Sequence, residues 1–334
     1  MADRRKHQVS LRGASAKEIT RAALLAKVTQ ERELRNYTRK AAAASLFIQR
    51  VWRGYRFTKK LVVKIRQEWE EAVVNCQPDV VITGEWVSTC LLRPFIFFIT
   101  RSSIAQKKLE VRNLNCMLTC FKILLQSIDS TECQKNFCSL ATGTLEERTT
   151  WNYQAKKIIF VSSFVLGECD PACPMGDDSC VATSLAMRVV VALTDLKGWK
   201  CIKSESLNDA EIAVKNLVRF MGTEQSGLHR NIRKYLMKLD MKVALQASSA
   251  LLMGDHFLII VSAITLALRP FQAGKSLPND SLYLEMQDVV EQHCVFLLTV
   301  PWLVQRLPAI LVPALKHQSV FAPCLSTLLV VADL

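Results

Sequence analysis

Hydrophobic and polar positions in the first quarter of the chain predict one long helix. No proline occurs between Ser15 and Val74, Gly54 is the only glycine, and Ala, Leu, Lys, Arg, Glu and Gln predominate. The stretch opens with Ser-Ala-Lys-Glu, which has the spacing of a capping box. We therefore expect a helix over residues 15–75. The basic, polar residues 1–14 before it are expected to form a disordered arm.

The remainder, over residues 85–334, predicts successive helices separated by short polar breaks, with glycine or proline at many of them, as at Arg269-Pro270. Alternating strand patterns are confined to two brief runs. The expected helices are Trp86–Thr100 (interrupted by Pro94), Lys107–Ile128, Thr149–Leu166, Val181–Leu196, Asn208–Met221, Leu228–Leu252, Phe257–Leu268, Ser281–Val300, Trp302–Lys316 and Val320–Val331. Helices at a spacing of about 20 to 25 residues, without strands, favour an all-α fold whose body is an irregular, solenoid-like helical repeat.

The most informative stretch lies inside the long helix, over residues 41–64, and it is amphipathic. Its sequence is AAAASLFIQRVWRGYRFTKKLVVK, in which six Lys and Arg residues and no acidic residue occur. The apolar residues recur mostly at steps of three to four, which places them on one side of a helix. A basic amphipathic helix suits a clasping acidic protein such as calmodulin, or an anionic surface.

The order of residues in this stretch resembles the IQ motif. Ile48-Gln49 is followed after three residues by Arg53-Gly54, and a bulky apolar residue follows at Leu61. The second basic position of the motif is Thr58 here, with lysines just after it. The candidate calmodulin-binding residues are Ile48, Gln49, Trp52, Arg53, Gly54 and Leu61.

That resemblance implies a role for each residue of the first half of the motif. Ile48 would enter the apolar groove of a calmodulin-like lobe, and Gln49 would hydrogen-bond at its edge. Arg53 would meet acidic groups, and Gly54 would let the partner's backbone come close. The alternative is a solvated basic helix whose Trp52 and other aromatic side chains, Phe47 and Tyr55, pack against the rest of the chain.

Charge divides the chain into a basic arm and a near-neutral body. Residues 1–66 hold 18 Lys and Arg against 4 Asp and Glu, whereas residues 67–334 hold 25 against 26. The arm could bind RNA, DNA or an anionic membrane directly. Because a purely electrostatic arm would not require the ordered Ile-Gln and Arg-Gly spacing, the sequence favours a protein partner over nucleic acid.

Hydropathy predicts no membrane span. The longest apolar run, Phe257–Leu268, is shorter than the roughly 20 residues that a spanning helix needs, and the run over residues 294–304 is broken by Pro301. The first 40 residues lack an apolar stretch of secretory-signal length. The twelve cysteines are therefore expected to be buried thiols in a reducing compartment, in the cytoplasm, the nucleus or both.

The sequence predicts no catalytic, cofactor-binding or metal-binding residue. The cysteine pairs and histidines stand apart in sequence, which argues against a structural zinc site. Cys180 follows two aspartates, whose charge would oppose a thiolate. Asp177-Asp178 is expected to cap the next helix, and Asp255-His256 to be a cap followed by a partly buried histidine. Both phosphate-binding glycine motifs, GxGxxG and GxxxxGK, are absent, so no cofactor is expected.

Four segments together resemble a known amino-terminal region. They are RRKHQVSLRGASAKE, ERELRNYTRKAAAASLFIQRVWRGYR, LLRPFIFF and CMLTCFKILLQSI, and the resemblance is most specific over residues 1–130. The region is that of plant HECT-type ubiquitin-protein ligases that carry an IQ motif. In that family a catalytic cysteine of the HECT domain receives ubiquitin as a thioester and passes it to a substrate lysine.

The resemblance implies that this chain is the regulatory and substrate-recruiting part of such a ligase. No position matches the HECT catalytic motif, and the chain still has a helical pattern at Leu334. We therefore expect a portion truncated before the HECT domain and inactive as a ligase by itself. Its implied partners are calmodulin or a calmodulin-like protein, and protein substrates of ubiquitination. A stand-alone calmodulin-binding adaptor is the alternative.

Overall fold

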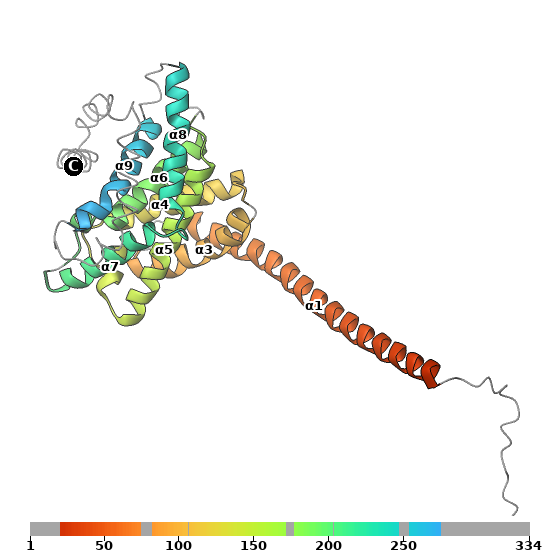
Figure 1. Cartoon of the computed structure of the whole chain (residues 1–334). Coiled ribbons are helices and arrows are strands. Elements are labelled where there is room, and N and C mark those ends of the chain that lie inside the picture. Colours follow the sequence, from red (N-terminus) through yellow and green to blue (C-terminus); the bar gives the residue numbers. More distant parts are fainter. Residues whose placement is uncertain are drawn as a thin grey trace, which may run out of the picture. The chain divides into compact units, whose positions relative to one another are not determined.

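The computed structural model describes residues 21–74, 82–105, 107–171, 177–202, 204–246 and 254–274. All elements in this part of the chain are helical, which confirms the all-α class (Figure 1). The chain divides into two compact units, Met1–Leu61 and Val62–Leu334. The expected arm over residues 1–14 and the three helices expected after residue 280 lie outside the described residues.

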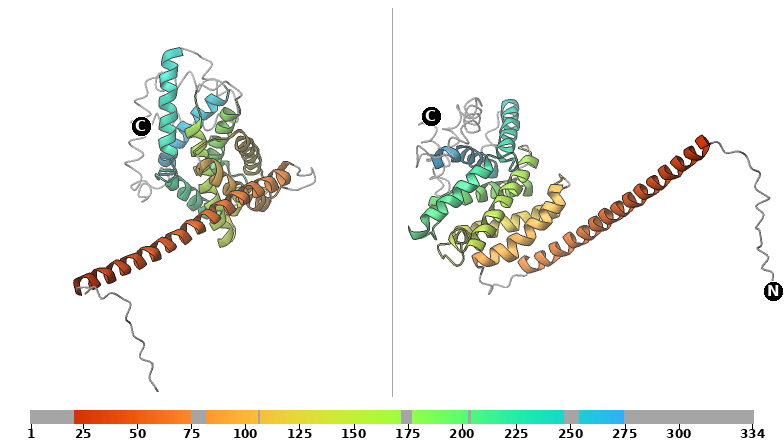
Figure 2. Two further views of the ribbon diagram at one scale, coloured as in Figure 1. Left: turned by 90° about the vertical axis from the view of Figure 1, so that its right-hand side faces the viewer. Right: turned by 60° about the horizontal axis from the view of Figure 1, so that its bottom comes forward.

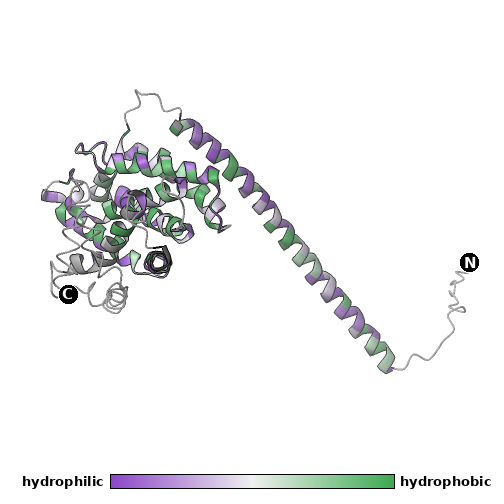
Figure 3. Ribbon diagram, turned by 90° about the horizontal axis from the view of Figure 1, so that it is seen from above, coloured by the Kyte–Doolittle hydropathy of each residue, from purple (hydrophilic) through white to green (hydrophobic). Residues whose placement is uncertain are grey.

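The predicted long helix is present as α1, Arg21–Val74, with 54 residues. Its described part falls inside the expected range of 15–75, and the first expected residues lie outside the described ones. Polar and apolar residues alternate along its length (Figure 3). A helix this long and this polar is not stabilised by intrinsic propensity alone, and it gains from packing wherever an apolar face is covered.

Four short elements form one continuous helix near the start of the second unit. They are α2 (Gly84–Trp86), η1 (Val87–Leu92), α3 (Arg93–Ile99) and η2 (Thr100–Ile104). The expected interruption at Pro94 is wrong. The turn η1 before it is a wider π-helix, in which the Arg93 amide donates to the Ser88 carbonyl, five residues back. This wider turn accommodates a proline ring that would clash in a regular α-helix.

This helix, Gly84–Ile104, is the one segment of the described chain that is long and apolar enough to cross a membrane, and half of its most apolar window is buried inside the fold. Val87, Leu91, Phe95, Phe98 and Ile99 are fully buried. The core helix of a soluble protein has the same length and composition, so the segment is weak support for a membrane span.

The other helices follow in chain order. They are α4 (Val111–Ile128), η3 (Phe137–Thr142), α5 (Leu145–Glu168), α6 (Asp178–Thr194), η4 (Leu196–Gly198), η5 (Ser204–Ser206), α7 (Leu207–Met221), α8 (Leu228–Gln246) and α9 (Gly254–Gly274). Most bounds lie within four residues of those expected from periodicity. The expected break at Arg269-Pro270 is wrong, because α9 continues through it.

Two helix starts differ from expectation for local reasons. Helix α4 begins four residues late, because Lys107 adopts a positive φ of 50° that no α-helix contains. Helix α5 begins four residues early, because Thr144 and Glu147 form a capping box. The Thr144 amide donates to Glu147 Oε2 at 2.7 Å, and the Glu147 amide donates to Thr144 Oγ1 at 3.3 Å.

The core of the second unit forms where α5 and α6 meet their neighbours. Helix α6 packs against α4, α5 and α9, and α5 packs against α8 (Figures 1 and 2). Fully buried aromatic side chains fill the space, including Phe95, Phe121, Phe137 and Trp151. Trp151 and Trp199 meet edge to face with ring centroids 5.5 Å apart, a favoured arrangement for aromatic pairs.

Candidate functional site

The IQ-type residues lie on the part of α1 that belongs to the first unit, and their apolar members are open to solvent. The side chain of Ile48 is 65 % exposed and that of Trp52 is 59 % exposed. Val51 and Tyr55 are exposed beside them, and the rings of Trp52 and Tyr55 stack with centroids 6.0 Å apart. Phe47 is exposed as well, and packing of these three aromatic side chains against the rest of the chain stays an alternative prediction.

Gly54 occupies an open position on the same helix. A Cβ placed there would meet no heavy atom within 4 Å outside the local helix backbone. Gln49 and Arg53 are exposed, whereas Leu61 is only half-exposed. The structure therefore places all six candidate residues on one helix, and the carboxy-terminal end of the motif is the least accessible part.

Three basic side chains lie on the opposite side of this helix. At about 100° per residue, Arg50, Arg53 and Lys60 point away from the side that carries Ile48 and Tyr55. No described residue forms a salt bridge with any of these three, and Lys64 pairs with Glu68 at 3.6 Å. The helix thus offers an apolar face and a separate set of cations to a partner.

The last turns of α1 belong to the second unit, where the apolar face is covered. Val62, Trp69 and Val73 are buried. The Trp69 ring lies 5.5 Å from the Phe98 ring and 5.9 Å from the Phe95 ring, centroid to centroid. Its Nε1 donates to the Leu91 carbonyl at 2.9 Å, which satisfies the polar end of an otherwise apolar side chain.

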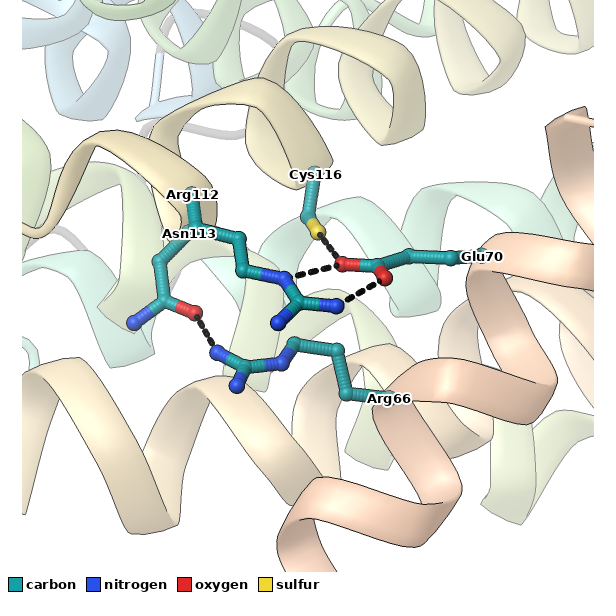
Figure 4. A network of polar contacts seen from close by, with 5 residues as sticks. All are labelled: Arg66, Glu70, Arg112, Asn113 and Cys116. Atoms are coloured by element: carbon teal, nitrogen blue, oxygen red, sulfur yellow. Dashed lines mark hydrogen bonds and ion pairs between the residues drawn. The ribbon is translucent and has the colours of Figure 1, made fainter.

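A polar network joins these turns of α1 to α4 (Figure 4). Arg112 donates to Glu70 through two bonds, Nε to Oε1 at 3.1 Å and Nη2 to Oε2 at 2.6 Å. Beside this pair, Arg66 Nη1 donates to Asn113 Oδ1 at 3.0 Å. Asn113 in turn donates to Ser103 Oγ at 2.8 Å, so its buried amide is bonded on both sides.

The network changes the pKa values of its members. Hydrogen bonding from Arg112 holds the pKa of Glu70 below its usual value, and the same bond raises the pKa of Arg112. Burial, with the adjacent Glu70 carboxylate, raises the pKa of the Cys116 thiol to about 12. Cys116 therefore stays a thiol at neutral pH and donates to Glu70 Oε1 at 3.6 Å.

The expectation of buried thiols holds for most of the described cysteines. Six are buried and two, Cys90 and Cys133, are exposed. Burial raises the pKa of Cys120 and Cys138, and raises that of Cys201 to about 11, so none of these three is a thiolate at neutral pH. Among the described residues, no group of three or more His, Cys, Asp or Glu side chains is placed to hold a metal ion.

Cys180 and His256, which are far apart in the sequence, lie side by side in the fold. The Cys180 Sγ atom is 3.5 Å from His256 Nδ1, and the Tyr235 hydroxyl is 3.5 Å from the same nitrogen. All three side chains are buried, with Cys180 completely shielded from solvent. Because a catalytic thiol needs access to its substrate, we interpret the group as core packing. The two residues are 76 positions apart in the sequence, which gives no local signal of this contact.

The expected cap at Asp177 is confirmed. Its side chain accepts a hydrogen bond from the Ser179 amide at 3.1 Å, and the residue directly precedes α6.

The exposed face around Ile48 is the best candidate site in the described part of the chain. No protein-family model matches this sequence, and no curated protein or solved structure matches it either.

Proposed function

We propose that the chain is the regulatory and substrate-recruiting amino-terminal region of a HECT-type ubiquitin-protein ligase. In this proposal α1 binds calmodulin or a calmodulin-like protein through Ile48, Gln49, Trp52, Arg53 and Gly54, and the helical body recruits protein substrates in the cytoplasm, the nucleus or both. The ligase assignment rests on the sequence resemblance, and a stand-alone adaptor remains the alternative.

One observation carries the binding part of the proposal, namely the solvent exposure of an apolar helix face with the IQ order of residues. Ile48 and Trp52 would each lose a large hydrated apolar surface on binding. The cations around them lack partners in the described structure and would attract an acidic protein. Helix-in-groove recognition uses this combination of anchors and charge.

The packing of the helical body is compatible with an irregular helical repeat, but it does not identify the type of repeat. Helix α6 packs on both α4 and α5, as stacked hairpins would. Contacts such as α6 with α9 join helices that are further apart in the chain, so the stacking is irregular. We assign substrate recruitment to this unit because its large helical surface remains after the binding helix is accounted for.

The binding proposal is tested by titrating the full chain with calmodulin, with and without calcium, in a calorimeter. Ile48→Ala should weaken binding about tenfold or more, because it removes an anchor side chain. Leu46→Ala, which removes an equally exposed side chain from the opposite side of the helix, is the matched control. Equal affinities for the wild type and Ile48→Ala would contradict the proposal.

Binding of nucleic acid or anionic lipid by the basic arm is the competing function. It is favoured by the excess of 14 positive charges in residues 1–66. That mode predicts a steep loss of affinity with salt for many unrelated polyanions, and no effect of Ile48→Ala. Calmodulin binding that depends on Ile48 and survives moderate salt would favour the protein partner.

The ligase part has its own test. The full chain, incubated with ubiquitin, an activating enzyme and a conjugating enzyme, should form no thioester, because it carries no HECT catalytic motif. A ubiquitin adduct that disappears on addition of a reductant would show a catalytic cysteine in this chain. That result would contradict the proposed regulatory and substrate-recruiting role.

A further inference from the structure

The apolar face of α1 extends well upstream of the IQ-type residues. Apolar and alanine side chains continue from the motif in alternating steps of three and four, at Leu34, Tyr37, Ala41 and Ala44. At about 100° per residue, they fall on the same side of the helix as Ile48. Leu34 and Tyr37 are 63 % and 71 % exposed, so the upstream half of the face is also open.

The downstream half of the face is already occupied. From Val62, which is 8 % exposed, the same side of α1 is buried in the second unit, and Trp69 is buried further along. Leu61, the last IQ-type residue, is itself half-exposed. A partner that grips Ile48 therefore finds free apolar surface toward Leu34, and much less toward Leu61.

Charge and spacing define the kind of occupant. Residues 35–64 contain nine Lys and Arg and no Asp or Glu, so a second copy of this helix would be repelled and an acidic partner attracted. Leu34 and Ile48 are 14 residues apart, which is about 21 Å along a helix. The short side chains of Ala41 and Ala44 between them leave room for a partner's backbone or the rim of its grooves.

We propose that an acidic protein with two apolar grooves, of the calmodulin type, binds α1 with one groove on Ile48 and Trp52 and the second groove on Leu34 and Tyr37. The inference rests on the proposed function and adds where the second groove goes. The second groove lies upstream of the Ile-Gln pair, because the same side of α1 is buried beyond the motif, at Val62 and Trp69.

The experiment compares calmodulin binding by three forms of the full chain. The double variant Leu34→Ala/Tyr37→Ala should bind about tenfold more weakly than the wild type, because it removes the second pair of anchors. The control double variant Leu24→Ala/Leu25→Ala removes two exposed apolar side chains that lie off this face, and it should bind like the wild type.

Hydrogen exchange on the wild-type chain gives a readout that needs no variant. Calmodulin should protect amides of residues 34–44 as well as those of residues 48–61. Protection confined to residues 48–61, with unchanged affinity for Leu34→Ala/Tyr37→Ala, would overturn this inference and leave the proposed function standing. No binding by the wild type would overturn both.

Discussion

At the scale of single residues, one carboxylate accepts most of the hydrogen bonds that link α1 to α4. Glu70 accepts two bonds from Arg112 and a third from the Cys116 thiol, while Arg66 next to it bonds Asn113. The sequence alone could not pair Glu70 with Arg112, because the two residues are 42 positions apart and no local pattern marks either of them. Periodicity finds helices, but it does not find which helix faces which.

Replacing Glu70 with glutamine should lower the free energy of unfolding at neutral pH by about 0.5–1 kcal/mol, the range for a partly exposed ion pair. Because the folded-state pKa of Glu70 is lowered, its contribution is complete above the unfolded-state pKa and is lost as the pH falls through the folded value. Urea denaturation of wild type and variant should therefore converge in acid. Glu71→Gln, at an exposed neighbouring position, should leave the free energy of unfolding at neutral pH close to that of the wild type, and a constant difference between Glu70→Gln and the wild type at all pH values would contradict the prediction.

At the scale of elements, the sequence predicted helices well and their ends less well. The sequence located α4 to within four residues, but it did not show which of its apolar side chains are covered: Val111 is exposed while Met117 and Leu124 are buried. The predicted helix breaks at Pro94 and Pro270 were wrong. A π-turn accommodates Pro94, and α9 continues through Pro270, although helix propensity alone predicts a break at each. Tertiary packing decided both cases.

Thr144 tests the cap that sets the start of α5. Thr144→Ala should lower the free energy of unfolding by about 1 kcal/mol, because the Glu147 amide loses its acceptor at the amino terminus of the helix. Thr144→Ser keeps the oxygen and should be close to wild type. Thr149→Ala, which removes an exposed threonine inside the same helix, should have little effect. Thermal denaturation compares the four proteins, and an equal loss for the alanine variants at 144 and 149 would count against the cap.

At the scale of the whole molecule, the chain combines a unit whose described part is a single exposed helix with a unit that has a large aromatic core. The sequence indicated this division through charge, since the basic excess ends near residue 66. The exposed face around Ile48 was predicted from its spacing. Its solvent exposure was not, because a pattern of apolar residues marks a face of a helix without saying whether that face is covered.

Limited digestion with trypsin should separate the two units. The first cuts should fall after basic residues between Arg35 and Lys60, where nearly all side chains of α1 are exposed in the described structure, because such a helix opens locally at low cost. Lys156 and Lys157 serve as internal controls, since they lie on α5 against aromatic rings. Mass spectrometry of early fragments reports the order, and initial cleavage at the α5 lysines would contradict the division.

Gly54 affects both the stability of α1 and its proposed binding of calmodulin. Glycine costs a helix about 0.5–1 kcal/mol relative to alanine, and no nearby atom in the described structure demands its small size. Gly54→Ala should therefore make the lone chain more helical by circular dichroism while weakening its hold on calmodulin. The same methyl group would then stabilise the free helix and weaken the complex. Glycine at this position would therefore favour partner binding at the expense of helix stability in the free chain.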